Sequence, residues 1–181
     1  MAILKIARLG HPVLLRRAEP VEDPTTPAMR RLVTDMAETM VDANGLGLAA
    51  PQVHEPLRVF VMRDGNRVFA LFNPEITALT EEREAAWEGC LSIPGLRGEV
   101  TRPVRVAWRG LDAKGKAVSG EADGMAARVM QHEFDHLEGL LYPMRMADLS
   151  RLGFNEELSR YAAGEGKVAA GKPGNRKDVN P

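Results

Sequence analysis

The residues with the clearest chemical potential form an H-E-x-x-H motif, His132-Glu133-Phe134-Asp135-His136. Four residues of an α-helix advance by about 400°, so the two histidines project from one face, about 40° apart. Both imidazoles can therefore reach one metal ion. Glu133 is offset from them and could contact a water molecule on that metal without becoming a ligand itself. The motif predicts a metal site on a helix.

A catalytic metal site usually has three protein ligands and one open position, so a third ligand must come from elsewhere in the chain. The metzincin pattern needs a histidine at position 142, where this sequence has Tyr142. Glu156 lies at the spacing of a glutamate-ligand zincin, but Arg160 stands where that pattern has an aspartate. His11 and His54 lie in a turn-like segment and just past a glycine-rich loop, and we interpret both as surface or structural residues.

Cys90, the sole cysteine of the chain, is the better candidate for the third ligand. It lies within Trp87–Ser92, where Gly89 permits an unusual backbone path beside the thiol. A thiolate is a good ligand for borderline metals, and a bound metal keeps it deprotonated. A lone cysteine is otherwise typically a small buried hydrophobic residue. A His₂Cys set would also suit an electron-transfer copper site, in which Glu133 would have no evident use.

A third segment, Gly45–Gln52, reads G-L-G-L-A-A-P-Q and follows a predicted helix. Phosphate-binding loops follow a strand and carry Gly-Lys-Ser/Thr, which this segment lacks, so the pattern does not favour a nucleotide site. Small residues let a ligand approach the backbone closely, and exposed N–H and C=O groups can pair with an extended peptide. The Gln52 side chain could donate a hydrogen bond to an oxyanion. A tight helix-to-strand connection is the alternative interpretation.

Together, these segments resemble the peptide deformylase family, whose members carry G-x-G-x-A-A-x-Q, E-G-C-x-S and Q-H-E-x-D-H in this order. The chain matches every fixed position, in Gly45–Gln52, Glu88–Ser92 and Gln131–His136, and the resemblance covers about residues 3 to 160. It implies a hydrolase that removes the formyl group from the N-terminal formyl-methionine of newly synthesised proteins and releases formate. The implied partner is a nascent formyl-Met polypeptide, with the ribosome as a candidate location.

The resemblance also implies roles for individual residues. The implied metal ligands are Cys90, His132 and His136. One Fe²⁺ per chain is the usual ion, and Zn²⁺, Ni²⁺ or Co²⁺ can occupy the site. Glu133 is the implied proton carrier, and Gln52 and the Leu91 backbone N–H are the implied oxyanion donors. Glu88 is interpreted as structural, paired with Arg102 to hold the cysteine loop. The implied substrate-binding residues are Gly45, Leu46, Gly47, Gly89, Met125 and Val129, with His132 also lining the methionine pocket.

Two other classes of function stay open at this point. A zincin peptidase with a carboxylate ligand would cleave internal peptide bonds and would tolerate the substitution Cys90→Ala. A formyl-peptide-binding or metal-binding protein without turnover would bind substrate analogues and release no formate.

Helices must position the H-E-x-x-H motif and the glycine-rich segment. Thr26 and Pro27 are typical of a helix start, and Asn44-Gly45 is typical of a helix end. A second helix is predicted over about 123–139, and a third after Asp148. The first has an apolar face made by Leu32, Val33, Met36 and Met40, and the third contains Leu149, Leu152, Leu158 and Tyr161.

Strands are predicted as two hairpin-like pairs, 57–62 with 67–72 and 103–108 with 116–121. This order of elements predicts an α+β fold. The resemblance adds a single domain in which the central H-E-x-x-H helix packs among mainly antiparallel sheets, with N- and C-terminal helices.

Length and composition bound the remaining expectations. The chain has 181 residues, of which 44% are hydrophobic and 27% charged, as is typical of one globular domain. We expect a catalytic domain over 1–163 and a disordered Gly/Lys-rich tail over 164–181. A net charge of −1 gives no bulk attraction to nucleic acid or anionic membranes. The sequence has no apolar run long enough for a membrane span and no signal peptide, and we expect a cytoplasmic protein.

Overall fold

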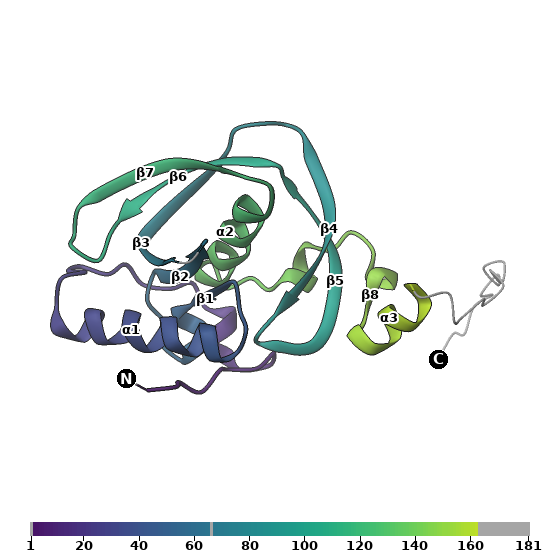
Figure 1. The fold of residues 1–181 in the computed structure, drawn as a ribbon, viewed down its shortest axis with the longest axis horizontal. Helices are drawn as coiled ribbons and strands as arrows, with labels where there is room; N and C mark the ends of the chain where they lie inside the picture. The colour runs from purple at the N-terminus through teal and green to yellow at the C-terminus, as the bar shows by residue number, and fades with distance from the viewer. Residues whose placement is uncertain (1, 66, 163–181) are drawn as a thin grey trace, which may run out of the picture.

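The computed structural model describes residues 2–65 and 67–162, so the tail predicted over 164–181 lies outside the described residues. Figure 1 shows two β-sheets around a central helix, α2 (Gly124–Leu137). A five-stranded sheet has the order β1-β2-β3-β6-β7, and a three-stranded sheet has the order β4-β5-β8. All pairs of these named strands are antiparallel, which confirms the predicted α+β fold class.

The five-stranded sheet contains both predicted strand pairs. Its strands are β1 (Gly47–Ala49), β2 (Val59–Asp64), β3 (Arg67–Ala78), β6 (Arg105–Leu111) and β7 (Ala117–Asp123). β3 is longer than the sequence predicts, because its second half pairs with β6 after a register shift between Phe72 and Glu75. This pairing joins the two predicted hairpins into one sheet and leaves β1 at the sheet edge.

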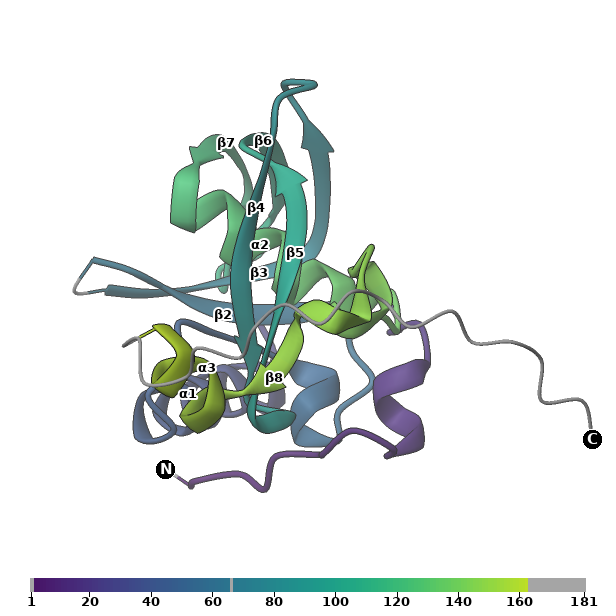
Figure 2. The same ribbon diagram turned by 90° about the vertical axis from the view of Figure 1, so that its right-hand side faces the viewer.

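The three-stranded sheet contains a long hairpin that the sequence analysis did not predict. Its strands are β4 (Arg83–Cys90), β5 (Ile93–Pro103) and the short β8 (Leu152–Phe154). Figure 2 shows β4 and β5 as a narrow ribbon, with β8 and the C-terminal helix beside β5. Cys90 is the last residue of β4, so the hairpin carries it to the turn that faces α2.

Helix α1 (Pro27–Asp42) begins where the sequence predicts. The Thr26 hydroxyl accepts a hydrogen bond from the backbone N–H of Met29 at 3.3 Å, and Pro27 occupies the first turn. The predicted apolar face packs into the core, with Met36 and Met40 fully buried. Asn44 follows the helix with a positive φ of 55°, as expected at a helix end.

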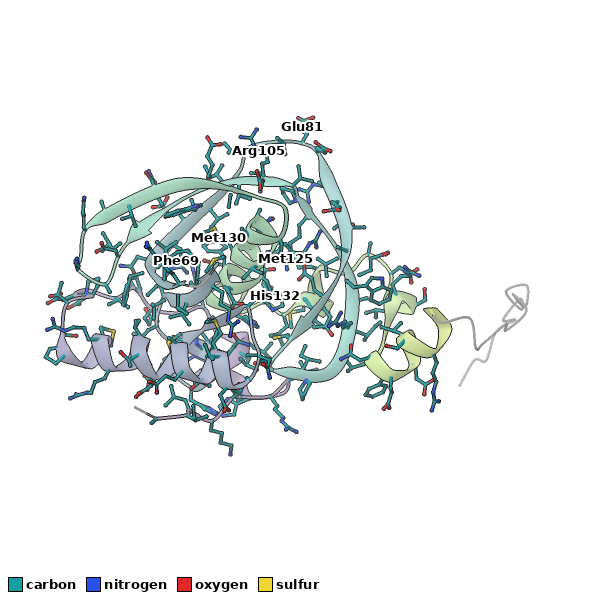
Figure 3. The ribbon with its side chains drawn as sticks, viewed as in Figure 1. Phe69, Glu81, Arg105, Met125, Met130 and His132 are labelled. Carbon is teal, nitrogen blue, oxygen red and sulfur yellow. The ribbon has the colours of Figure 1, made fainter. Side chains whose placement is uncertain are left out.

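Helix α2 carries the H-E-x-x-H motif between the two sheets. Met130 and Leu137 pack against the five-stranded sheet, and Figure 3 shows Met130 near Phe69 on that side. The helix ends before Gly139, whose φ is +74° and whose Cα lies against the backbone of Leu15. A side chain at position 139 would collide with that backbone at 2.9 Å, so glycine is required there.

The prediction of a third helix directly after Asp148 is wrong in its boundary. The Asp148 side chain does accept a hydrogen bond from the Ser150 N–H, but it caps only the short 3-10 helix η4 (Leu149–Arg151). Leu152–Phe154 then pairs with β5 as β8, and α3 (Asn155–Ala162) starts only afterwards. The remaining 3-10 helices are η1 (Pro12–Leu15), η2 (Ala50–Val53) and η3 (Tyr142–Arg145). Among the described residues, none of the helices has the length and apolar character needed to cross a bilayer.

Candidate metal centre

The structure brings Cys90, His132 and His136 together between β4 and α2. One potential ligand atom from each residue lies within 4.8 Å of the other two. The Cys90 Sγ is 3.3 Å from Nε2 of His136, and the two imidazole rings have centroids 5.0 Å apart. Within the described part of the chain, this is the one group of three or more such residues that could hold a metal ion.

Glu88 fixes the orientation of the first histidine. Its Oε2 lies 2.9 Å from Nδ1 of His132, which leaves Nε2 of that ring for a ligand. Burial alone would raise the pKa of Glu88, but hydrogen bonds from His132 and Arg102 lower it to about 2. Burial would likewise lower the pKa of His132, but hydrogen bonds to Cys90 and Glu88 raise it to about 10.

Arg102 holds Glu88 by two hydrogen bonds, which confirms the predicted pair. Its Nε is 2.7 Å from Oε1 of Glu88, and its Nη2 is 2.9 Å from Oε2. A second guanidinium, that of Arg128, donates to the same Oε1 at 2.8 Å. Sequence reasoning missed Arg128, because no local pattern marks which of the 24 basic residues is buried. Its position one turn before His132 on the motif helix is the one available signal, and that position does not by itself indicate burial.

Glu133 is buried and has a free carboxylate oxygen. Its Oε2 has no hydrogen-bond partner, and burial raises the pKa of the side chain to about 7. The side chain lies against Gly47 of β1, where an added Cβ would sit 2.7 Å from both Cγ and Cδ of Glu133. Glycine at position 47 therefore leaves the space that the Glu133 side chain fills.

Gln52 lies beside the thiol and is fully buried. Its Oε1 accepts from the Ala49 N–H at 2.9 Å, and its Nε2 lies 3.5 Å from the Cys90 Sγ and 3.2 Å from the Ser92 Oγ. Leu91 follows Cys90 in the turn between β4 and β5. The structure therefore places the Gln52 amide beside the thiol, with Leu91 in the adjoining turn.

The three candidate ligands fit a divalent metal ion. A thiolate and two imidazoles suit borderline metals, and three protein ligands leave a position for a reactant. Burial lowers the pKa of His136 well below its usual value, so this ring is neutral, whereas His132, whose pKa is raised, must release its proton when it binds a metal. The unpartnered Oε2 of Glu133 is beside this set, which suits a polar reactant rather than an apolar core.

A cavity of about 520 Å³ opens beside the cluster, and we call it the first cavity. Cys90, His132, Glu133, Gln52 and Leu91 all contribute to its lining. The predicted substrate-binding residues also line it: Gly45, Leu46, Gly47, Gly89, Met125 and Val129. The remaining lining residues include Arg97, Arg128 and Asn155, which sequence reasoning did not name. Figure 3 shows Met125 on the same helix as His132, and Met125 lies at the start of α2.

The alternative ligands lie elsewhere. His11 and His54 contact each other, with ring centroids 4.6 Å apart, and both are exposed. Glu156, the carboxylate ligand of the zincin alternative, is exposed on α3 and is not in the cluster. Glu156, the residue expected to be the third ligand of a zincin peptidase, is therefore not available to the metal site in this structure.

Comparisons with known proteins agree with this geometry. The family model described as polypeptide deformylase matches residues 3–152. Peptide deformylase 1 of Bordetella pertussis is 46% identical over 163 residues, covering 84% of this chain and 93% of that protein. The crystal structure of peptide deformylase from Thermotoga maritima is similar with a TM-score of 0.79 and 42% identity, covering 82% of this chain and 100% of that one.

A second structure, a peptide deformylase from Synechococcus elongatus in complex with actinonin, has a TM-score of 0.80 and 35% identity, and covers 90% of this chain and 87% of that one. The residues matched by the family model include the whole of α2 and all three sequence motifs. The chain belongs to the polypeptide deformylase family.

Proposed function

We propose that Cys90, His132 and His136 hold one divalent metal ion and that Glu133 is the proton carrier of the reaction. As a peptide deformylase, the protein hydrolyses the formyl amide of an N-terminal formyl-methionine to formate and a free amino terminus. One observation carries the residue assignment. The candidate ligand atoms of three residues lie within 4.8 Å of one another, beside a buried carboxylate oxygen that has no partner.

We propose Fe²⁺ as the native ion, as the resemblance to the deformylase family implies. A thiolate with two imidazoles accepts several divalent metals, so Zn²⁺, Ni²⁺ and Co²⁺ can replace it. When bound, such an ion polarises the formyl carbonyl and lowers the pKa of a water molecule. The hydrogen bond between Glu88 and His132 Nδ1 presents the opposite nitrogen of the ring to the ion.

Glu133 moves the proton in this mechanism. Its carboxylate accepts a proton from the attacking water and then delivers it to the amine nitrogen of methionine as the carbon–nitrogen bond breaks. The close packing on Gly47 keeps the carboxylate in one position throughout. The unpartnered Oε2 is the oxygen available for this transfer.

Gln52 and Leu91 act on the negative charge that develops on the formyl oxygen. The Gln52 Nε2 lies beside the Cys90 thiol, and the Leu91 N–H is in the next peptide of the same turn. Each preorganised donor of this kind stabilises a transition state by about 3 kcal/mol. The bond from the Ala49 N–H to the Gln52 Oε1 directs the amide nitrogen toward the thiol.

The first cavity receives the end of the nascent polypeptide. β1 is an edge strand, so an extended peptide can pair with its free side, with Gly45, Leu46, Gly47 and Gly89 approaching the substrate backbone. The methionine side chain occupies the part of the cavity lined by Leu46, Met125, Val129 and His132. The physiological substrate is then a nascent chain at the ribosome.

The assignment is tested by measuring formate release from formyl-Met-Ala-Ser together with bound metal. Glu133→Ala should keep the ion and lose turnover, and Cys90→Ala should lose most of the ion. His54→Ala, a change at an exposed histidine, is the matched control and should alter neither quantity. An active Glu133→Ala variant would remove Glu133 as proton carrier, and full metal content in Cys90→Ala would mean that another residue ligates. Loss of activity in air after anaerobic purification would support iron.

A further inference from the structure

A second cavity, of about 380 Å³, lies on the other side of α2. Helix α2 contributes Gln131, Phe134 and Asp135 to this second cavity, whereas it contributes residues such as Val129 and His132 to the first. The ends of β3, β4 and β5, the start of β6 and the 3-10 helix η3 complete the wall. The two cavities share no lining residue, so the second is a separate site.

The second cavity is lined by more positive than negative charge. Three arginines, Arg83, Arg102 and Arg145, line it, and Asp135 is its one carboxylate among the described residues. Asp135 is buried and accepts from Arg102 Nη1 at 2.8 Å and from Arg145 Nη2 at 2.6 Å. One carboxylate therefore serves two of the three guanidinium groups.

The ion-pair network behind this cavity contains more arginines than carboxylates. Arg102 also pairs with Glu88, but Glu88 in turn is shared with Arg128. In this network three guanidinium groups, those of Arg102, Arg128 and Arg145, share two carboxylates. The surplus positive charge therefore lies at the accessible end of the network, on Arg145, where an anion from solution can reach it.

At the accessible end of the network, Arg83 and Arg145 have N–H groups without a hydrogen-bond acceptor among the described residues. The Arg83 side chain is exposed and forms no ion pair or hydrogen bond in the part of the chain that the structure describes. Arg145 uses Nε and Nη2 on Asp135, and its Nη1 has no partner there. Its side chain is 47% exposed, so solvent and solutes can reach it. Glu82 and Glu84 flank Arg83 in the sequence, but neither lines the cavity.

We propose that the second cavity binds a small oxyanion of the phosphate class between Arg83 and Arg145. Planar guanidinium groups bind phosphate oxygens in pairs of parallel hydrogen bonds, and a concave site with an excess of positive charge attracts such anions. The volume suits a small free anion, whereas a nucleic acid backbone would need a longer basic surface than these residues provide.

Inorganic phosphate is the probe, titrated at constant ionic strength and followed by calorimetry and by ³¹P line broadening. Wild-type protein stripped of metal should bind phosphate saturably at one site. Arg83→Gln and Arg145→Gln should each weaken binding by about tenfold or more, the effect of losing a charge-assisted hydrogen bond. Arg31→Gln, a change at an exposed arginine on α1 that does not line the cavity, is the control and should bind as wild type.

Three outcomes would overturn the proposal. Non-saturating binding, or equal losses in Arg31→Gln and Arg83→Gln, would indicate general surface attraction. Binding that requires the metal-loaded protein and vanishes after metal removal would place the anion in the first cavity. Because Arg83 is exposed and unpaired, Arg83→Gln should fold and retain wild-type deformylase activity, so its result stands even where Arg145→Gln is unstable.

Discussion

Gly47→Ala is the substitution that most directly tests how the structure positions Glu133. The added methyl group would lie 2.7 Å from both Cγ and Cδ of the glutamate. Carbon atoms in ordinary contact are about 3.5–4.0 Å apart, so the two side chains would overlap by about 1 Å. Glu133 must move by about that distance, since Gly47 is fixed by its strand register opposite Met62.

The expected loss follows from this displacement. Misplacing a catalytic group by about 1 Å can cost about 100-fold in rate, or about 2.7 kcal/mol in the transition state. Overpacking of this kind also lowers the free energy of unfolding by about 1–3 kcal/mol. The three candidate ligands are not displaced by the new methyl group, so the bound metal should be retained.

The assay measures kcat for formate release together with metal content and urea unfolding. Gly89→Ala is the packing control, because an added Cβ there would meet no protein atom closer than 3.7 Å. Since Gly89 also faces the substrate backbone in the proposed complex, any effect of this variant should appear mainly in KM, and kcat should fall much less. Glu133→Asp shortens the side chain, so adding Gly47→Ala to that variant should cost less than it costs the wild type. A Gly47→Ala enzyme with wild-type kcat would refute the positioning argument. Strictly additive losses would do the same.

Four further predictions test other parts of the site. Gln52→Leu should lower kcat by about 100-fold or more at unchanged metal content, as loss of an oxyanion donor does; a silent substitution would remove that role. Arg102→Met removes a partner from the buried carboxylates of Glu88 and Asp135, and it should lower the free energy of unfolding by about 3 kcal/mol. Arg109→Met, at an exposed ion pair, is the control and should change this free energy by less than about 1 kcal/mol. Chelation of the metal should abolish turnover but preserve the circular dichroism spectrum, because α2 packs on both sheets independently of the ion; unfolding on chelation would contradict this. Truncation after residue 163 should leave kcat and metal content unchanged, and a loss of either would assign a role to the tail.

Much of the site could be predicted from the sequence because its chemistry is encoded at short range. The spacing of His132 and His136 places both rings on one helix face without any knowledge of the rest of the fold. Cys90 was found because it is the sole cysteine and follows a glycine. The structure brings these three residues together, and it also confirms the pairing of Glu88 with Arg102.

The β4–β5 hairpin could not be predicted because its stability is not local. β4 reads R-E-A-A-W-E-G-C and β5 contains Gly95 and Gly98, a composition with low intrinsic strand preference. Contacts distant in the sequence hold the hairpin instead. Gly98 lies against Tyr142 and Met146, and Arg128 donates to the Val100 carbonyl at 2.9 Å. None of these partners is apparent from a window of neighbouring residues.

The prediction of where the third helix begins was wrong for a related reason. Leu149 and Leu152 have helical spacing, and Asp148 is a good cap, so the local signals agree on a helix. Pairing of Leu152 with Gly98 of β5 draws the chain into an extended conformation before α3 begins. Tertiary pairing therefore outweighs local helix preference over this short segment.

The E-G-C-x-S motif on β4 and the Q-H-E-x-D-H motif on α2 have spacings that fit each other in three dimensions. Two residues along a strand span about 6.6 Å, and four residues along a helix rise about 6 Å. Glu88 and Cys90 on β4 therefore meet His132 and His136 on α2 in the same order, at 2.9 and 3.3 Å. One contact orients an imidazole and the other completes the candidate ligand set. Since both depend on the same strand, a shift of β4 along α2 would break the two contacts together, and Arg102, bonded to Glu88 and to Asp135 on α2, opposes that shift.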